Sequence, residues 1–313
     1  MKGGTPSVLD PKGHGASIIA TEMWIQFAVG AAIFVLVVGL LGWILLVRSR
    51  RDPGERMPLD ESAARRWVLL GGVAMPVVVL SLLVAVSARS LARLASPPSR
   101  EVTTVEVIGH RWWWEVRYPD YAVTTANEIV LPAGRSVRLR VRSADVIHSL
   151  WIPQLQRKID LEPGTWNTTW IRADDAGQYR GVCAEFCGES HALMQLLVEA
   201  LPPDRWDAWV THARAPATIP ADRSEQLGEQ VFLSTCAYCH TIEGTPAHGA
   251  VGPDLTHLAS RRTIVSALLP NTQANLARWI SGPQRVKPGA LMPPFRLDDG
   301  RMRALLDFLE SLQ

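Results

Sequence analysis

The sequence predicts a multi-domain membrane protein: a hairpin of two transmembrane helices, then an all-β domain, then a small all-α domain. Three observations carry this prediction. Two long uncharged runs lie near the N-terminus of the 313-residue chain, segments that alternate apolar and polar residues follow, and the C-terminal part combines helical periodicity with a short cysteine–histidine motif. At roughly 150 residues per domain, this length accommodates two globular domains once the membrane segments are set aside.

The two uncharged runs cover residues 23–47 and 67–88. At about 1.5 Å per residue, each is long enough to cross a hydrocarbon core of about 30 Å. Two such runs in succession favour membrane helices over buried core helices. Pro76 lies inside the second run and predicts a kink, which neighbouring helices can accommodate in a membrane.

The charges flanking these runs predict their direction. The loop 48–66 carries six arginines, whereas the segment 1–22 has only Lys2 and Lys12 as basic residues. By the positive-inside rule the loop is cytoplasmic, so the N-terminus and everything after Arg89 face the outer side of a bacterial plasma membrane. We expect either that the first helix is itself the insertion signal or that a leader lies outside this sequence.

The overall charge excludes one class of partner. The chain has 32 basic and 30 acidic residues, a formal net charge of +2. This balance does not suit a protein that neutralises nucleic-acid phosphates. We therefore expect membrane lipid, and no nucleic acid, around this chain.

Residues 100–201 form the first outer domain. Their period-two alternation, β-branched content and Pro-Gly punctuation predict antiparallel strands. Two segments, DVIHSLWIP and GVCAEFCGESHALM, supply soft and imidazole ligands: His148, Cys183, Cys187, His191 and Met194.

Two thiolates, two imidazoles and a thioether together favour copper. Because two cysteines exceed the single thiolate of a mononuclear blue-copper site, a pair of sulfur-bridged coppers is the natural interpretation. A Cys183–Cys187 disulfide and a closed tetrahedral zinc site are the alternatives.

A linker, residues 202–222, leads to the second outer domain, residues 223–313. Its C-x-x-C-H motif, Cys236, Cys239 and His240, is the attachment signal for c-type haem, with the histidine as an iron ligand. Half a zinc site and a redox dithiol are the alternatives, but no further cysteine pair is left for zinc and no βαβ context supports the dithiol. The second iron ligand must come from a small group of candidates: His248, His257, Met292 and Met302.

The setting of each methionine separates these candidates. Met302 lies on the apolar face of the final helical segment and is expected in the core. Met292 stands in the loop KPGALMPPF, which its prolines fix, and is the favoured ligand.

Together these segments resemble subunit II of caa3-type cytochrome c oxidase. The resemblance implies a cupredoxin-like sandwich with a binuclear copper (CuA) site, in which Cys183 and Cys187 bridge the coppers and His148 and His191 bind one copper each. It further implies weak axial ligation by Met194 and by the backbone carbonyl of Glu185. The Glu185 side chain would reach a magnesium ion at the boundary with subunit I.

The C-terminal domain resembles class I cytochromes c. The resemblance implies that Met292 is the distal haem ligand and that Pro253, in the segment GPDL, packs beside the haem histidine. It also implies that Gly228 and Phe232 lie where an N-terminal helix crosses the C-terminal helix near Phe308. In the first outer domain, the aromatic run GHRWWWEVRYPD resembles the family's electron-receiving strand, with Trp112 at the receiving position.

The function implied is that of subunit II of an aa3/caa3-type oxidase. Electrons would pass from cytochrome c through haem c and CuA to the haem a/CuB subunit, for oxygen reduction coupled to proton translocation. Expected partners are subunits I and III and a donor, cytochrome c or a bc1-type complex. One departure is that no carboxylate lies between Arg66 and Pro76, where the family commonly has a proton-channel glutamate.

Two other functions remain open at this point. The chain could serve a different terminal reductase, such as a CuA-containing nitric oxide reductase, as the subunit that accepts electrons. It could also be a membrane-anchored metal-binding or redox-sensing module.

Overall fold

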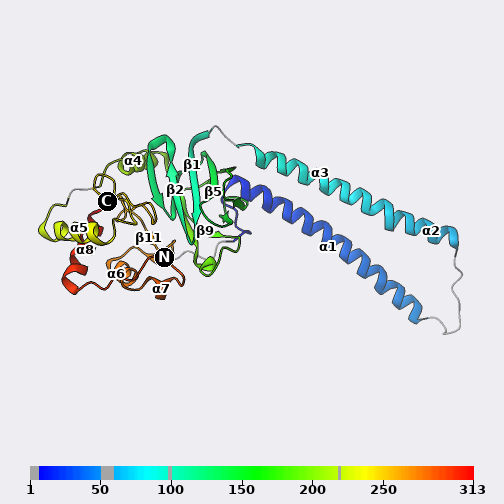
Figure 1. The fold of residues 1–313 in the computed structure, drawn as a ribbon. Coiled ribbons are helices and arrows are strands. Elements are labelled where there is room, and N and C mark those ends of the chain that lie inside the picture. The colour runs from blue at the N-terminus through cyan, green and yellow to red at the C-terminus, as the bar shows by residue number, and fades with distance from the viewer. Residues whose placement is uncertain (1–6, 51–59, 98–100, 218–219) are drawn as a thin grey trace. The chain divides into compact units, whose positions relative to one another are not determined.

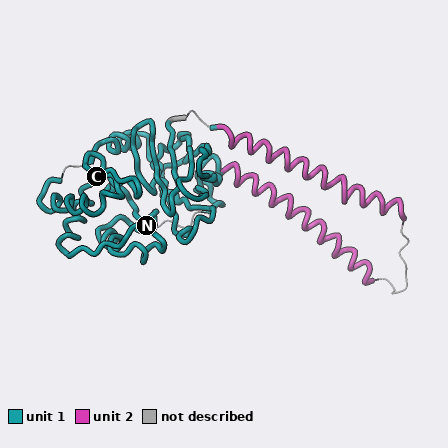
Figure 2. Tube along the Cα trace, viewed as in Figure 1, with its two compact units in different colours: residues 1–16, 97–313 teal, residues 17–96 magenta. Residues whose placement is uncertain are grey.

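The computed structural model of the chain describes residues 7–50, 60–97, 101–217 and 220–313. Two compact units are present, one of residues 1–16 and 97–313 and one of residues 17–96 (Figure 2). The middle of the predicted cytoplasmic loop, residues 51–59, lies outside the described residues.

The smaller unit contains two long apolar helices. The first, α1 (His14–Ser49), extends beyond the predicted span 23–47 at both ends. The second runs through α2 (Glu61–Leu69), η1 (Leu70–Ala74) and α3 (Met75–Ala95). Both are long and apolar enough to cross a membrane by length and composition. The Ser87 hydroxyl donates a hydrogen bond to the Glu22 carboxylate and so joins the two helices.

The disturbance predicted at Pro76 is a π turn, not an abrupt break. The turn η1 ends at Ala74, two residues before the proline. A proline lacks the amide hydrogen that a helix needs and its ring crowds the preceding turn, and a widened turn relieves that crowding. The helix therefore continues through the proline.

The first outer domain is a sandwich of two five-stranded sheets, which confirms the predicted all-β fold (Figure 1). One sheet has the order β3-β2-β1-β5-β8 and the other β4-β10-β9-β6-β7. The prediction of antiparallel strands was wrong for two pairs, β1–β5 and β4–β10, which are parallel. The strands are β1 (Glu101–His110), β2 (Trp113–Tyr118), β3 (Val123–Ala126), β4 (Glu128–Pro132), β5 (Ser136–Ser143), β6 (His148–Trp151), β7 (Ile159–Leu161), β8 (Asn167–Ile171), β9 (Gly177–Cys183) and β10 (Gln195–Leu201). Two short 3-10 turns interrupt them, η2 (Pro119–Tyr121) and η3 (His191–Leu193).

Alternation along β2 builds the sandwich core. Trp114, Val116 and Tyr118 are buried between the sheets, and the intervening side chains point outward. The Tyr118 hydroxyl donates to the Val130 carbonyl at 2.9 Å and accepts from its amide at 2.8 Å, so its polar end is satisfied. Trp113 and Trp114 therefore face opposite sides of the strand, as period-two alternation requires.

Trp112, however, does not lie on this strand. Strand β1 ends at His110 and β2 begins at Trp113, so Arg111 and Trp112 form the turn between them. The Arg111 amide donates to Asp145 at 2.7 Å, which ties the turn to the segment before β6. The expected aromatic strand is thus an aromatic turn followed by a strand.

Part of the predicted linker 202–222 is helical. Helix α4 (Pro203–Ala213) buries Trp206 to 2% exposure, with its ring 6.2 Å from that of Tyr118. This helix therefore packs on the sandwich, and the connection to the next domain begins after Ala213.

The C-terminal domain is small and mainly helical, as predicted. It contains α5 (Arg223–Thr235), β11 (Thr263–Ile264), β12 (Leu269–Pro270), α6 (Gln273–Ser281), α7 (Pro283–Val286) and α8 (Asp299–Ser311). Helix α5 begins in a capping box, in which Asp222 accepts from the Glu225 amide at 2.8 Å and the Glu225 side chain returns a contact to the cap.

Helices α5 and α8 cross at Gly228. A Cβ atom there would lie 2.0 Å from the Ala304 carbonyl oxygen and 2.6 Å from the Phe308 Cβ, so only glycine permits this approach. Beside the crossing, the rings of Phe232 and Phe308 lie 5.7 Å apart. The crossing has the residues that the cytochrome resemblance implied.

We expect Gly228→Ala to destabilise this domain, because the added methyl group collides with a backbone atom that cannot move alone. Overpacking of this kind costs about 1–3 kcal/mol or more. Chemical unfolding of the purified chain, followed by helical circular dichroism, measures the loss. Gly300→Ala is the control, since Gly300 is exposed in the first turn of α8 and the change should stay within about 1 kcal/mol. Equal stability of the two variants would contradict the prediction.

Candidate metal and haem sites

Strands β6, β9 and β10, together with the loop between β9 and β10, bring the candidate copper ligands to one end of a sheet. His148 opens β6, Cys183 closes β9, and Met194 immediately precedes β10. Antiparallel pairing of β6 with β9 sets Leu150 opposite Cys183, which places His148 within reach of that cysteine. The Cys183 amide donates to the Met194 carbonyl at 2.9 Å, so the loop from 184 to 193 closes on itself.

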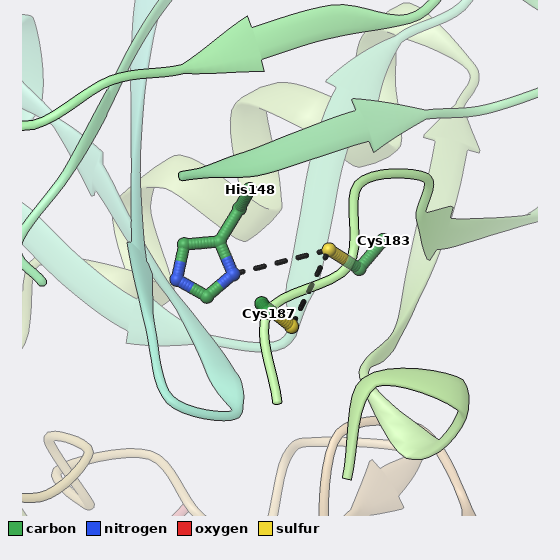
Figure 3. Close-up of side chains that lie close together, drawn as sticks. All are labelled: His148, Cys183 and Cys187. Atoms are coloured by element: carbon green, nitrogen blue, oxygen red, sulfur yellow. Dashed lines mark hydrogen bonds between the residues drawn. The ribbon is translucent and has the colours of Figure 1, made fainter. Parts of the chain in front are cut away.

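The donor atoms of all these side chains converge. Cys183 Sγ lies 3.8 Å from Cys187 Sγ and 3.8 Å from His148 Nδ1 (Figure 3). Cys187 Sγ is in turn 3.6 Å from His191 Nδ1 and 3.9 Å from Met194 Sδ. Neither cysteine is in a disulfide, so the structure does not contain the Cys183–Cys187 bridge considered from the sequence.

The same cluster separates the two roles considered for Glu185. Its backbone carbonyl accepts from Cys183 Sγ at 3.2 Å and so faces the sulfur atoms. The residue itself is exposed, as is the neighbouring Phe186 at 76%. One residue thus presents an oxygen to the cluster and a carboxylate to the surface.

Proton sharing within the cluster suits metal binding. The contact with Cys187 holds the pKa of Cys183 well below its usual range, although burial opposes this shift, and the same contact raises the pKa of Cys187. One thiolate is therefore available at neutral pH. A soft metal would displace the second thiol proton, since metal ligands must be deprotonated.

Asp145, which no sequence motif marks, orients His148. Its carboxylate Oδ1 accepts from His148 Nε2 at 2.8 Å, which leaves Nδ1 facing the cysteines. Burial opposes ionisation of Asp145, but the hydrogen bond from His148 lowers the pKa of Asp145 to about 2. Carboxylate–histidine pairs of this kind fix the ring of a metal ligand. Asp145 lies three residues before His148, within ADVIH, a spacing that could have drawn attention to it.

The haem motif lines a cavity of about 350 Å³ between the C-terminal domain and the part of the sandwich that carries Trp112. Cys236, Cys239, His240 and Met292 all contribute to its wall, and most other lining residues are apolar. This set of thiol, imidazole and thioether donors around an apolar cavity fits a covalently attached haem.

His240 is prepared to bind a metal through one nitrogen. Its Nδ1 donates to the Pro253 carbonyl at 2.7 Å, which leaves Nε2 free. Burial lowers the pKa of His240, so the ring is neutral at physiological pH. Pro253 is the proline that the cytochrome resemblance placed beside this histidine.

Only one of the four candidates for the second iron ligand lines the described wall of this cavity, namely Met292. His257 Nδ1 contacts the Gln313 carbonyl at 2.8 Å, and His248 is exposed. Met302 packs on the helical core, where it was expected. The geometry therefore favours Met292.

Trp112 links the two candidate sites. Trp112 lines the haem cavity, together with Trp113. Its indole Nε1 donates to the backbone carbonyl of Cys187 at 2.9 Å. Trp112, in the turn between β1 and β2, thus forms part of the wall of the haem cavity and is hydrogen-bonded to Cys187 of the copper-ligand cluster.

Comparison with known proteins agrees with this division of the chain. Residues 122–201 match the family described as cytochrome c oxidase subunit II, periplasmic domain, and residues 225–313 match the cytochrome c family. Cytochrome c oxidase subunit 2 of Alkalihalophilus pseudofirmus is 33% identical over 98% of this chain and 91% of its own length. The subunit 2 of Bacillus sp. PS3 is 30% identical over 85% of this chain and 80% of its own length.

A solved structure is also similar. The periplasmic domain of cytochrome oxidase subunit II from Bradyrhizobium japonicum is 29% identical, with a TM-score of 0.36, and the match covers 39% of this chain and 96% of that one.

The matched domains imply haem c and a CuA copper site, in a membrane-anchored protein with a periplasmic domain. The relatives are electron-transfer subunits of an oxidoreductase complex, which implies assembly with other oxidase subunits. This chain belongs to the cytochrome c oxidase subunit II family, in the caa3-type form with a fused C-terminal cytochrome c domain.

Proposed function

We propose that this chain accepts electrons at its cytochrome c domain and passes them through the CuA domain to the haem a/CuB subunit. There, oxygen reduction would be coupled to proton translocation. The observation that carries the proposal is the convergence of six donor atoms, from His148, Cys183, Glu185, Cys187, His191 and Met194, within contacts of 3.2–3.9 Å.

Within that cluster, we assign Cys183 and Cys187 as the bridging ligands of two coppers. His148 and His191 would each bind one copper, because each ring nitrogen faces a different sulfur. Met194 and the Glu185 carbonyl would complete the site as weak ligands. Copper in this set supplies a one-electron acceptor, and haem with histidine and methionine ligands supplies a one-electron carrier of raised potential.

The protein's own contribution is a dry and rigid setting. Met194 has no exposed surface, and Cys183 and Cys187 are 6% and 4% exposed. His148 lies on β6 and Cys183 on β9, and Met194 is directly joined to β10. Asp145 fixes the ring of His148. Ligands fixed by strands and by a second layer of hydrogen bonds need little rearrangement when the metal changes oxidation state.

We further propose a two-pass arrangement in the bacterial plasma membrane, with both redox domains on the outer side. Subunits I and III would be the membrane partners, and cytochrome c or a bc1-type complex the donor. The exposed Glu185 side chain would bind magnesium where this chain meets subunit I. The proposed limits are 1–22 for the N-terminal outer segment, 23–47 and 67–88 for the membrane spans and 48–66 for the cytoplasmic loop. The CuA domain would cover 100–201, with helix α4 packed on it, and the linker predicted over 202–222 would be shortened to 214–222, ahead of the cytochrome c domain at 223–313.

The first test is spectroscopic. The purified full chain, loaded with copper and haem, should show the mixed-valence electron paramagnetic resonance signal of paired coppers together with c-type haem bands. Cys187→Ser should abolish the copper signal and leave the haem bands, because it removes a bridging sulfur but lies outside the haem motif. Bound zinc without haem would contradict the proposal.

Met292→Ala should remove the sulfur-to-iron absorption band and lower the haem potential, because a methionine ligand raises that potential. Redox titration of the full chain measures the shift. Met302→Ala is the matched control: Met302 packs on the helical core and should leave the band in place. A band that persists in Met292→Ala would identify another distal ligand.

Asp145→Asn should weaken copper retention about 10–100-fold, the usual cost of removing a carboxylate that orients a metal-binding histidine. Competition with a copper chelator, read from the mixed-valence signal, measures the change. Asp160→Asn is the control, since Asp160 is exposed on the neighbouring strand β7. Equal retention in both variants would rule out the orienting role of Asp145.

A further inference from the structure

Two glycines, one from each redox domain, lie against the ring of Trp112. A Cβ at Gly188 in the copper loop, residues 184–193, would lie 3.0 Å from Trp112 Cζ2. A Cβ at Gly289 in the distal-ligand loop, residues 287–295, would lie 2.8 Å from Trp112 Cη2. Both glycines have positive φ angles, 114° and 75°, which side-chain-bearing residues rarely adopt. The backbones of both loops can therefore lie directly on the indole ring.

Lys287 fastens the distal-ligand loop to the turn that carries Trp112. The Lys287 ammonium donates to the Trp112 backbone carbonyl and, at 2.7 Å, to the Ser266 hydroxyl. Ser266 in turn donates to the same carbonyl at 2.8 Å. Nearby, the Ser190 hydroxyl of the copper loop donates to the Pro288 carbonyl at 2.5 Å.

Lys287 is an unusual residue for such a place. It is only 4% exposed, and no carboxylate of the described residues forms an ion pair with it. Only four of the 32 basic residues in the chain are lysines. A buried ammonium without a counter-ion is unfavourable unless its hydrogen bonds offset the lost hydration. These hydrogen bonds join two domains, so we infer that they position one domain on the other.

A second contact joins the same two domains without using Lys287. Glu199 on β10 accepts both guanidinium contacts of Arg262, at 2.9 and 2.6 Å. The buried Glu128 on β4 accepts from the Thr263 amide at 2.8 Å and from its hydroxyl at 2.5 Å. Loss of Lys287 would therefore loosen the distal-ligand loop and leave the cytochrome c domain attached.

We propose that Lys287 positions the distal-ligand loop on Trp112, so that Trp112 conducts electrons from the chain's own haem and is closed to diffusible donors. The contacts form a short chain: the loop that bears Met292, the Gly289 backbone, the Trp112 ring, and the hydrogen bond from its Nε1 to the Cys187 carbonyl. The step is a one-electron transfer in which ferrous haem becomes ferric and the copper pair gains one electron. No bond or proton moves.

This inference rests on the proposed function, so its test separates the two. The test uses the full chain with copper and haem in the assembled oxidase, as wild type, Lys287→Met and the control Lys158→Met. Lys158 is an exposed lysine on the sandwich. If wild type transferred no electron from haem to copper, the proposed function would fail, whatever Lys287 does.

The first measurement is hydrogen–deuterium exchange over residues 109–114 and 286–292, which requires no electron transfer. Lys287→Met should exchange faster than wild type in both segments, and Lys158→Met should match wild type. Unchanged exchange in Lys287→Met would overturn the positioning role.

The second measurement is the rate of copper reduction after flash reduction of the haem. Lys287→Met should slow this rate several-fold, because a loosened loop no longer holds the haem at a fixed distance from Trp112. The sulfur-to-iron band and the mixed-valence copper signal should not change. Loss of that band would mean that Lys287 supports haem ligation instead of docking, and an unchanged rate would mean that the loop contact does not conduct. Either result overturns the proposal.

The third measurement needs no variant. A soluble monohaem cytochrome c is mixed with oxidised wild type at increasing concentration. Haem reduction should accelerate with the donor concentration, and copper should follow at a rate independent of it. Copper reduction ahead of the haem, in proportion to the added cytochrome, would show that Trp112 is open to external donors and would overturn the closed surface.

Discussion

The antiparallel pairing of β6 with β9 is the constraint on which the copper-ligand cluster and its contact with Trp112 depend. It sets His148 beside Cys183 at the end of one sheet, and the loop that leaves β9 then brings Cys187 to the same point. That loop also presents the Cys187 carbonyl to Trp112. A shift of one residue in this register would move His148 to the other face of the sheet and dismantle the ligand cluster.

The buried polar groups around Cys183 and Lys287 are stabilised by one another more than by solvent. The cluster around Cys183 and the contact of Lys287 with Trp112 both bury groups that would otherwise be hydrated. Such burial is unfavourable for isolated groups and becomes tolerable only when each donor meets an acceptor. The two networks meet at Trp112, which donates to one through its ring and accepts from the other through its carbonyl.

The structural features that could be predicted from the sequence are those that depend on a short contiguous segment of it. Cys236, Cys239 and His240 form one motif, and period-two alternation located β2 and its buried face. Trp112 was placed on a strand because alternation does not mark where a strand begins. Lys287 and Ser266 contact Trp112 across more than 150 positions of sequence, and no local pattern reports such a contact. Asp145 is an intermediate case: it lies only three residues before the ligand His148, but it belongs to no recognisable motif.

Helix α4 has a consequence for how far the cytochrome c domain can travel. Because Trp206 anchors that helix to the sandwich, only residues 214–222 connect it to α5. Nine residues span at most about 30 Å when fully extended. A cytochrome c domain that left Trp112 would therefore stay tethered near the CuA domain, at an effective concentration in the millimolar range. The tethered domain would rebind Trp112 quickly after each dissociation. It would therefore occupy this surface ahead of any freely diffusing electron carrier.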